Sequence, residues 1–154
     1  MDKDEKYVLL EQYRIYSDAK EKFIDREFTT NRFYLVLNII VLLATYFLSA
    51  LTPQYQPVII LSIIGLSISL MWWINIDTYQ TMIKIKYANV LEYLETKLPE
   101  RPYNKEYNDY KELKKQKHLI VFSDFQKILT IIIAGIYFFA LVYNVANMIK
   151  FQML

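Results

Sequence analysis

Three long apolar segments constrain the fold of this chain more than any other feature. They run from Phe33 to Thr52, from Pro57 to Ile76 and from Ile128 to Met148. An α-helix needs about 20 apolar residues to cross the hydrocarbon core of a bilayer, and each segment is close to that length. A short loop around Pro53 separates the first two, whereas a long charged stretch separates the second from the third. We therefore expect an all-α membrane protein with three transmembrane helices.

The distribution of charge supports this expectation. No Asp, Glu, Lys or Arg occurs from Phe33 through Ile76 or from Ile128 through Ile149. A charged side chain at the bilayer centre costs about 3 kcal/mol on insertion scales, so windows of this length without charge are informative. The alternative is a soluble domain with three buried core helices, but a chain of 154 residues is small for enclosing three of them.

Lysine and arginine residues predict the orientation in the membrane. Seven of them precede the first span, ten lie between Asp77 and Lys127, and the loop around Pro53 has none. Because cytoplasmic loops carry an excess of positive charge, we expect the N-terminus and the middle segment in the cytoplasm and the C-terminus outside. Three aromatic residues lie around the end of the second span, where an aromatic belt would meet the lipid headgroups: Trp72, Trp73 and Tyr79.

The apolar pattern of the charged parts is helical and divides the chain into segments. An imperfect apolar stripe runs through residues 5 to 30, and a cleaner one continues the second span to Leu98, where Pro99 and Pro102 end the helix. The expected segments are a cytoplasmic amphipathic helix (1–31), a first span (32–52), a second span (57–76) continuing as a cytoplasmic helix to 98, a bend with a short helix (99–118), a third span (119–149) and an outside tail (150–154). The apolar faces outside the spans exceed what one subunit can bury, which predicts oligomerisation.

Two of the spans carry polar residues at intervals of seven. Asn31, Asn38, Thr45 and Thr52 follow one another in the first, with Ser49 beside them, and the third has Ser123, Thr130, Tyr137 and Asn144. This interval keeps side chains nearly on one helix face. Such a face can bond neighbouring helices together, or it can line an aqueous path in an oligomer. The candidate pore-lining residues are Asn38, Thr45 and Ser49.

The second span carries small residues instead of a polar stripe. Ser62, Gly65 and Ser69 follow one another at helical spacing, and Gly65 and Ser69 form a small-xxx-small pattern. Small residues let two helices approach closely in a membrane. We expect this face to be a helix-packing face.

The chain offers little chemistry of the enzymatic kind. It has no cysteine, no phosphate-binding glycine loop, no zinc-protease motif and no nucleophile motif, so we expect no enzyme, cofactor or catalytic residue. His118 is the single histidine and is expected to be an exposed helix residue. The glutamates around Pro99 could form a solvated helix face or a divalent metal site. We expect the solvated face, and hence no bound metal. Asp124 and Lys127, one turn apart, are a neutralising pair or a gate charge. The net charge of +2 argues against a nucleic-acid partner.

The stretch from Trp72 to Glu106 carries a more specific pattern. It contains Trp72-Trp73, Tyr79, Lys86-Tyr87 and a run from Val90 to Tyr103 that ends in Leu-Pro-x-x-Pro-Tyr, after an N-terminal helix of the kind Tyr13 to Phe28. With these residues the chain resembles the RipA-type bacterial octameric membrane protein family. The resemblance implies a ring-shaped homo-oligomer, an octamer, in a bacterial inner membrane, without enzymatic activity. It also implies a cytoplasmic collar, to which we assign Lys86, Glu92, Glu95, Pro99 and Pro102.

The layout is also similar to that of SLATT effectors, which combine a two-span hairpin with a long cytoplasmic helix and are thought to form pores in antiphage defence. The first functional hypothesis is therefore a homo-oligomeric inner-membrane pore. Its expected partners are membrane lipid and other copies of itself, and a further candidate partner is a nucleotide signal or a soluble cytoplasmic protein. The alternative is a non-conducting scaffold whose collar recruits a soluble partner, motivated by the Tyr-rich charged surface from Tyr103 to Tyr110. A transporter or enzyme is disfavoured because the three apolar segments hold no Asp, Glu, Lys, Arg or His.

Overall fold

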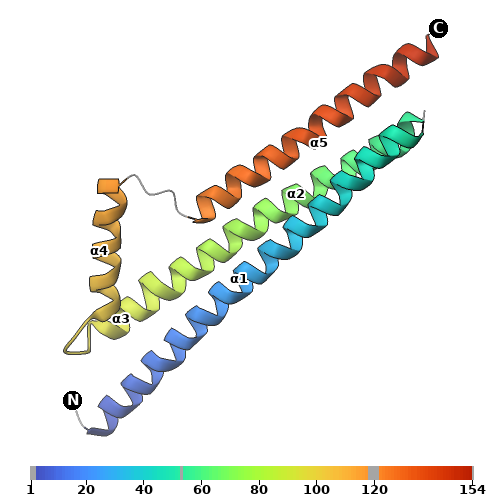
Figure 1. Cartoon of the computed structure of the whole chain (residues 1–154). Helices are drawn as coiled ribbons and strands as arrows, with labels where there is room; N and C mark the ends of the chain where they lie inside the picture. The colour runs from blue at the N-terminus through green and yellow to red at the C-terminus, as the bar shows by residue number, and fades with distance from the viewer. Residues whose placement is uncertain (1–2, 53, 118–121, 154) are drawn as a thin grey trace. The chain divides into compact units, whose positions relative to one another are not determined.

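The computed structural model of the chain describes residues 3–52, 54–117 and 122–153, and every regular element in these ranges is helical. The elements are α1 (Lys3–Leu51), α2 (Tyr55–Lys84), the π-helical segment η1 (Ile85–Leu91), α3 (Glu92–Glu95), α4 (Pro102–Lys117) and α5 (Phe122–Gln152) (Figure 1). The expected all-α class is thereby confirmed.

Three of the helices are long and apolar enough to cross a membrane. By length and composition these are Lys3–Leu51, the run Tyr55–Glu95 and Asp124–Gln152. Each contains one of the apolar segments that the sequence singled out, so three candidate spans are confirmed. The residues at which each helix would enter and leave a bilayer stay predictions. His118 and the first residues expected in the third span lie outside the described residues.

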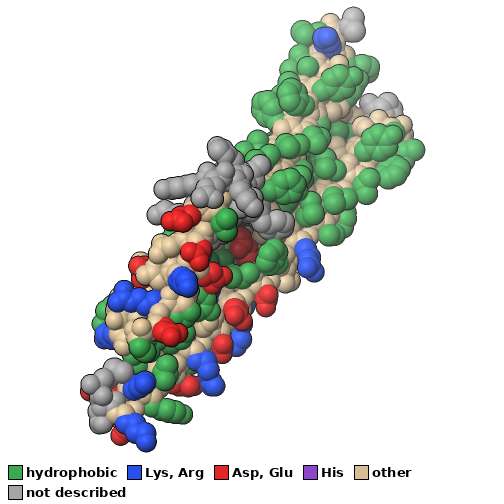
Figure 2. Space-filling model, turned by 60° about the vertical axis from the view of Figure 1, so that its left-hand side comes forward, with side chains coloured by type: hydrophobic (Ala, Val, Ile, Leu, Met, Phe, Trp, Pro, Cys, Tyr) green, Lys and Arg blue, Asp and Glu red, His purple; other side chains and the backbone are tan. Residues whose placement is uncertain are grey.

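Two compact units make up the chain. The membrane unit consists of Thr29–Ile76 and Ser123–Leu154, and the charged unit consists of Met1–Phe28 and Asp77–Phe122. Only four charged residues belong to the membrane unit, namely Arg32, Asp124, Lys127 and Lys150. Figure 2 shows hydrophobic side chains over the membrane unit and Lys, Arg, Asp and Glu side chains gathered over the charged unit.

In the membrane unit, α1 and α2 form an antiparallel hairpin and α5 runs alongside it (Figure 1). Leu51 is the last residue of α1, and Thr52 closes its final turn by donating from both its backbone N–H and its hydroxyl to the carbonyl of Leu48, at 3.0 and 2.8 Å. Pro57 falls in the first turn of α2, where its missing N–H has no partner to lose. These turns explain how so short a loop reverses the chain.

The charged unit combines the first part of α1 with the end of α2, η1, α3 and α4. The sequence predicted an unbroken helix from 57 to 98. The structure has seven π-helical residues in this run, Ile85–Leu91, and the regular helix ends at Glu95. A wider π turn changes the direction in which all later side chains point. In this structure Leu91, Leu94 and Glu95 are buried, while Glu92 is exposed.

Candidate functional site

The interior of the membrane unit combines a buried apolar cluster with many buried polar side chains. Its outer faces consist of large apolar side chains such as Val36, Ile40 and Leu43 on α1. Its buried side chains include a continuous set of polar ones, which we call the polar seam: Asn31, Asn38 and Thr45 on α1, Ser62 and Ser69 on α2, and Gln126, Thr130, Tyr137 and Asn144 on α5. The heptad stripes of the first and third spans thus face each other across the small-residue face of the second.

At one end of the seam, a hydrogen-bonded triad joins all three helices. The indole Nε1–H of Trp72 donates to Oδ1 of Asn31 at 2.9 Å, and Nδ2 of Asn31 donates to Oε1 of Gln126 at 3.0 Å. All three side chains are buried, so each polar atom in these contacts is satisfied inside the subunit. The triad therefore holds α1, α2 and α5 together at this end of the bundle.

Asn38 and Tyr137 form the middle of the seam. Both side chains have an exposed fraction of 0 %. Ser69 donates its hydroxyl to Oδ1 of Asn38 at 3.1 Å, Asn38 donates Nδ2 to the carbonyl of Tyr34, and the Tyr137 hydroxyl donates to the carbonyl of Asn38 at 2.9 Å. Val41, Trp72, Ile76 and Ile133 pack around Tyr137 as an apolar cluster. At this level of the subunit, the described side chains of α1, α2 and α5 are in direct contact.

Gly65 makes room for the Tyr137 ring. A Cβ atom at position 65 would come within 2.2 Å of Tyr137 Cε1 and Cζ, whereas a Cβ at Gly135 would meet nothing within 4 Å. Ser62 and Ser69, buried one turn to either side of Gly65, keep the same face of α2 narrow. The small residues of α2 are therefore where the rings and amides of its neighbours are accommodated.

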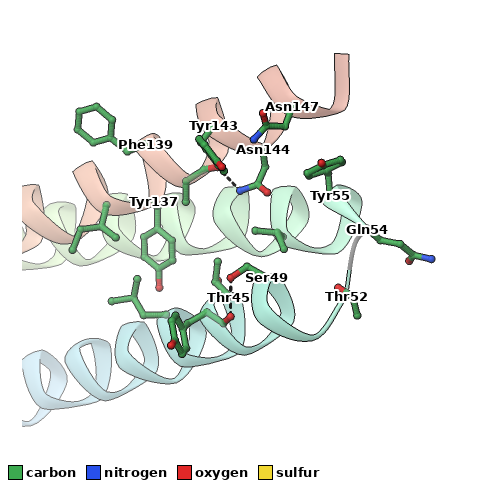
Figure 3. Close-up of a pocket in the computed structure, with 15 residues that line it drawn as sticks. Thr45, Ser49, Thr52, Gln54, Tyr55, Tyr137, Phe139, Tyr143, Asn144 and Asn147 are labelled. Atoms are coloured by element: carbon green, nitrogen blue, oxygen red, sulfur yellow. Dashed lines mark hydrogen bonds between the residues drawn. The ribbon is translucent and has the colours of Figure 1, made fainter. Parts of the chain in front are cut away.

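Beyond Tyr137 the seam opens into a cavity of about 750 Å³ between α1, α2 and α5. Its polar lining residues come from both heptad stripes and from the end of α1, and they include Thr45, Ser49, Thr52, Asn144 and Asn147. Figure 3 shows the Tyr137 ring reaching from α5 towards α1, to the left of Thr45. Tyr137 lines the cavity and forms its floor. We call it the vestibule.

The structure separates the three candidate pore-lining residues. Thr45 and Ser49 line the vestibule, and their hydroxyls donate to the carbonyls of Val41 and Tyr46, both at 2.7 Å. Asn38 lies beneath the floor, with its amide bonded to two neighbours. Asn38 therefore holds helices together in this structure, and its part in a pore stays a prediction.

The three expected interface residues have different environments. Trp72, with an exposed fraction of 1 %, lies in the core of the membrane unit and does not face outward as a belt residue would. Trp73 is half-buried, and Nζ of Lys127 lies 5.6 Å from its ring centroid. Tyr79 belongs to the charged unit, where its ring meets Phe23 edge-on with 6.4 Å between centroids.

The collar residues of the charged unit converge on Glu95. This carboxylate has an exposed fraction of 0 % and accepts three hydrogen bonds: Tyr13 Oη–H and Tyr103 N–H bond Oε1 at 2.9 and 2.8 Å, and Asn104 N–H bonds Oε2 at 3.0 Å. Pro102 is the first residue of α4, so Glu95 occupies the N-terminal end of that helix, where the backbone N–H groups and the helix dipole favour an anion. Glu95 thereby ties α1 and α4 to α3.

Aromatic rings and lysines support the same contact. Ser17 and Tyr103 share a hydrogen bond of 2.5 Å between their hydroxyls, and Nζ of Lys20 lies 4.5 Å from the Tyr103 ring centroid. Burial lowers the pKa of Lys20, against the opposing effect of Glu106 and Glu21. Lys86 lies over Phe23, with 4.6 Å between Nζ and the ring centroid. Pro99 lies in the exposed connection between α3 and α4.

Gln126 was not singled out from the sequence, and Glu95, although assigned to the collar, was not expected to be buried. Glu95 was grouped with the solvated glutamates, although it follows Leu91 by four residues and precedes Leu98 by three, and so shares their apolar stripe. Gln126 lies four residues before Thr130 and one turn from the third-span stripe. A polar residue on an otherwise apolar helix face was the available signal in both. Within the described residues, no group of three His, Cys, Asp or Glu side chains is arranged to hold a metal ion.

A bundle with an apolar surface, a polar hydrogen-bonded interior and three helices of membrane-spanning length defines an integral membrane protein of the polytopic α-helical class. The profile of the octameric membrane protein family (8xMP) matches residues 10–146. The chain belongs to this family, which confirms the resemblance seen in the sequence and supports self-association in a membrane. Neither the curated proteins nor the solved structures include a match to the chain.

Proposed function

We propose that this protein is a homo-oligomeric, non-enzymatic membrane pore, and that its permeation path follows the polar seam. The observation that carries the proposal is the vestibule, because it brings the polar residues of two separate spans to one space large enough for many waters, in a unit whose outer faces are apolar. Membrane helices that needed only to pack could do so with small and apolar residues alone. Eight buried polar side chains and the Tyr137 hydroxyl, all in the membrane unit, exceed that need.

The structure then corresponds to the closed state of such a pore. The vestibule is open above Tyr137, and the contacts of Tyr137, Asn38 and Ser69 close the seam below it. Opening would require α5 to move relative to α1, breaking the bond from the Tyr137 hydroxyl to the Asn38 carbonyl. Gating of this kind by a buried aromatic side chain is compatible with the absence of charge from the seam.

Conductance of the purified protein in planar lipid bilayers tests the proposal. We expect Thr45→Val combined with Ser49→Ala to lower single-channel conductance severalfold, because two vestibule hydroxyls are lost with little change in side-chain volume. Ser67→Ala is the matched control, since Ser67 is exposed on α2 and makes the same kind of bond to its own helix. The proposal fails if the intact protein, assembled and correctly oriented, carries no current under any voltage.

For the pore we further propose the bacterial inner membrane as location, with the N-terminus in the cytoplasm and the C-terminus outside. The asymmetry of Lys and Arg supports this orientation, which places the vestibule in the outer half of the bilayer. The layout shared with SLATT effectors supports permeabilisation during antiphage defence or stress as the setting. Rapid depolarisation of cells on induced expression, weaker for the Thr45→Val/Ser49→Ala variant, is the expected result.

The second candidate is a non-conducting scaffold that recruits a soluble partner. It is favoured by the charged unit, where Tyr7, Val8, Leu10 and Ile15 of α1 expose large apolar side chains. Such surface outside a membrane span calls for a covering protein or another copy of this chain. Substituting Val8 and Ile15 by Glu should release a bound partner from a protein that carries no current in lipid bilayers. A current through the intact protein would contradict the scaffold and support the pore.

A further inference from the structure

The vestibule has a chemical character that goes beyond its being polar. Among its described lining residues none is acidic or basic. Thr45, Ser49 and Thr52 each donate their hydroxyl hydrogen to a carbonyl of α1, at 2.7 to 2.8 Å, and Asn144 donates Nδ2 to the carbonyl of Ala140 at 2.7 Å. These four side chains have therefore used the donors that those bonds require, and they keep oxygen lone pairs for a ligand.

The aromatic rings strengthen this bias, whereas the helix ends do not. Thr52 directly follows the last residue of α1 and Tyr55 is the first residue of α2, so the partial negative charge of one helix end and the partial positive charge of the other lie close together and offset each other. The rings of Tyr46, Tyr55 and Tyr143 complete the wall, and aromatic faces attract cations. Gln54, Asn147 and the tyrosine hydroxyls can also donate, but they are neutral dipoles. The described lining has no Lys or Arg, the side chains that bind anions most strongly.

We propose that the vestibule is a binding site for monovalent alkali cations, and that it makes the pore cation-selective. Cation selectivity rests on the proposed function as a pore, whereas cation binding does not depend on conduction. One water molecule takes up about 30 Å³ in liquid water. The vestibule, with a volume of about 750 Å³, therefore admits a cation with much of its hydration shell. Hydroxyl and amide oxygens replace the remaining waters. A divalent ion would call for carboxylate ligands, and the described lining has none.

Thermal unfolding of the full-length protein in detergent measures binding without any current. The melting temperature is compared in potassium chloride and in N-methyl-D-glucamine chloride of equal concentration, because the organic cation is too large to share the ligands. We expect a higher melting temperature in K⁺, since a ligand that binds the folded state alone stabilises it. In Thr45→Val/Asn144→Leu the K⁺-dependent part should disappear, whereas Ser67→Ala should keep it.

Reversal potentials under a KCl gradient measure selectivity. The intact protein should favour K⁺ over Cl⁻ by roughly tenfold or more, and the double variant should approach equal permeability while still conducting. A K⁺-dependent melting shift without current would uphold the cation site and overturn the pore. Current without cation preference, together with a melting temperature that is equal in both salts, would uphold the pore and overturn the cation site. A melting shift that survives in the double variant would place the ion elsewhere and also overturn the site.

Discussion

At the scale of single residues, the membrane unit depends on one close contact between a glycine and a tyrosine. Tyr137 is fully buried, donates to the backbone of α1 and lies against α2 where Gly65 lacks a side chain. The ring is held by a hydrogen bond at one end and packs against the apolar cluster around it, while one side of it borders the vestibule. The identity of residue 65 therefore controls whether the three helices can close.

The first prediction is that Gly65→Ala destabilises the protein by about 1–3 kcal/mol, because the new methyl group overlaps the Tyr137 ring. The loss appears as a lower melting temperature in detergent. Gly135→Ala is the control, since its Cβ meets open space and alanine is the better helix former. Equal effects of the two substitutions would show that α2 and α5 do not approach as closely as described.

At the scale of elements, Glu95 holds the charged unit together. The carboxylate satisfies two N–H groups at the start of α4 and a hydroxyl of α1, while sitting at the end of α3 itself. A buried carboxylate without such partners would be costly, so the three bonds and the residue depend on one another. The π turns of η1 precede α3, and the face that α3 turns towards α1 depends on them.

The second prediction concerns this contact. Glu95→Gln should weaken the attachment of α4 by about 2 kcal/mol, because the charge at the helix N-terminus is lost and one oxygen acceptor becomes an N–H donor facing another N–H. Hydrogen exchange of the amides in the first turn of α4 should accelerate. Glu92→Gln removes the same charge from an exposed position nearby and should leave exchange unchanged. Similar acceleration in both variants would mean that net charge, and not the buried contact, matters.

At the scale of the whole molecule, family membership and apolar surface together indicate an oligomer. The outer faces of α1, α2 and α5 are all apolar, so composition alone does not distinguish the face that meets lipid from the face that meets another subunit. Lipid and protein offer an apolar helix face nearly the same environment. Shape and close packing must then decide which faces associate.

The third prediction is that the protein extracted in mild detergent has a protein mass eight times that of one chain, as native mass spectrometry or single-particle imaging would measure. A ring is the expected arrangement, because closed symmetry satisfies identical interfaces in every copy. Gly65→Ala should reduce the assembled fraction only to the extent that it unfolds the subunit. A monodisperse monomer that retains its melting temperature would contradict the prediction.

The fourth prediction tests orientation. Reporter domains fused to the N-terminus and C-terminus should report opposite sides of the membrane, with the N-terminal one cytoplasmic. The reason is the concentration of Lys and Arg before the first span and between the second and third spans. Replacing Lys150 by Gln is a suitable control, because it removes the one basic residue beyond the third span and should leave the orientation as it is.

Sequence alone determined the helical class, the three apolar segments and the family resemblance, because these depend on hydropathy and charge along the chain. It also placed Asn38, Thr45, Tyr137 and Asn144 on shared helix faces, since an interval of seven has that consequence in any helix. It could not determine what those faces meet. A polar stripe looks the same whether it binds a neighbouring helix or borders water.

Only the tertiary structure decided between these environments, level by level along the seam. Asn38 is bonded inside the bundle because Ser69 and Tyr137 reach it, whereas Thr45 borders the vestibule because α5 presents no side chain that fills the space. Trp72 and Glu95 show the same dependence, since their partners Asn31 and Tyr13 lie 41 and 82 residues away in the chain. Periodicity describes one helix at a time, and contacts over such separations arise only when several helices pack.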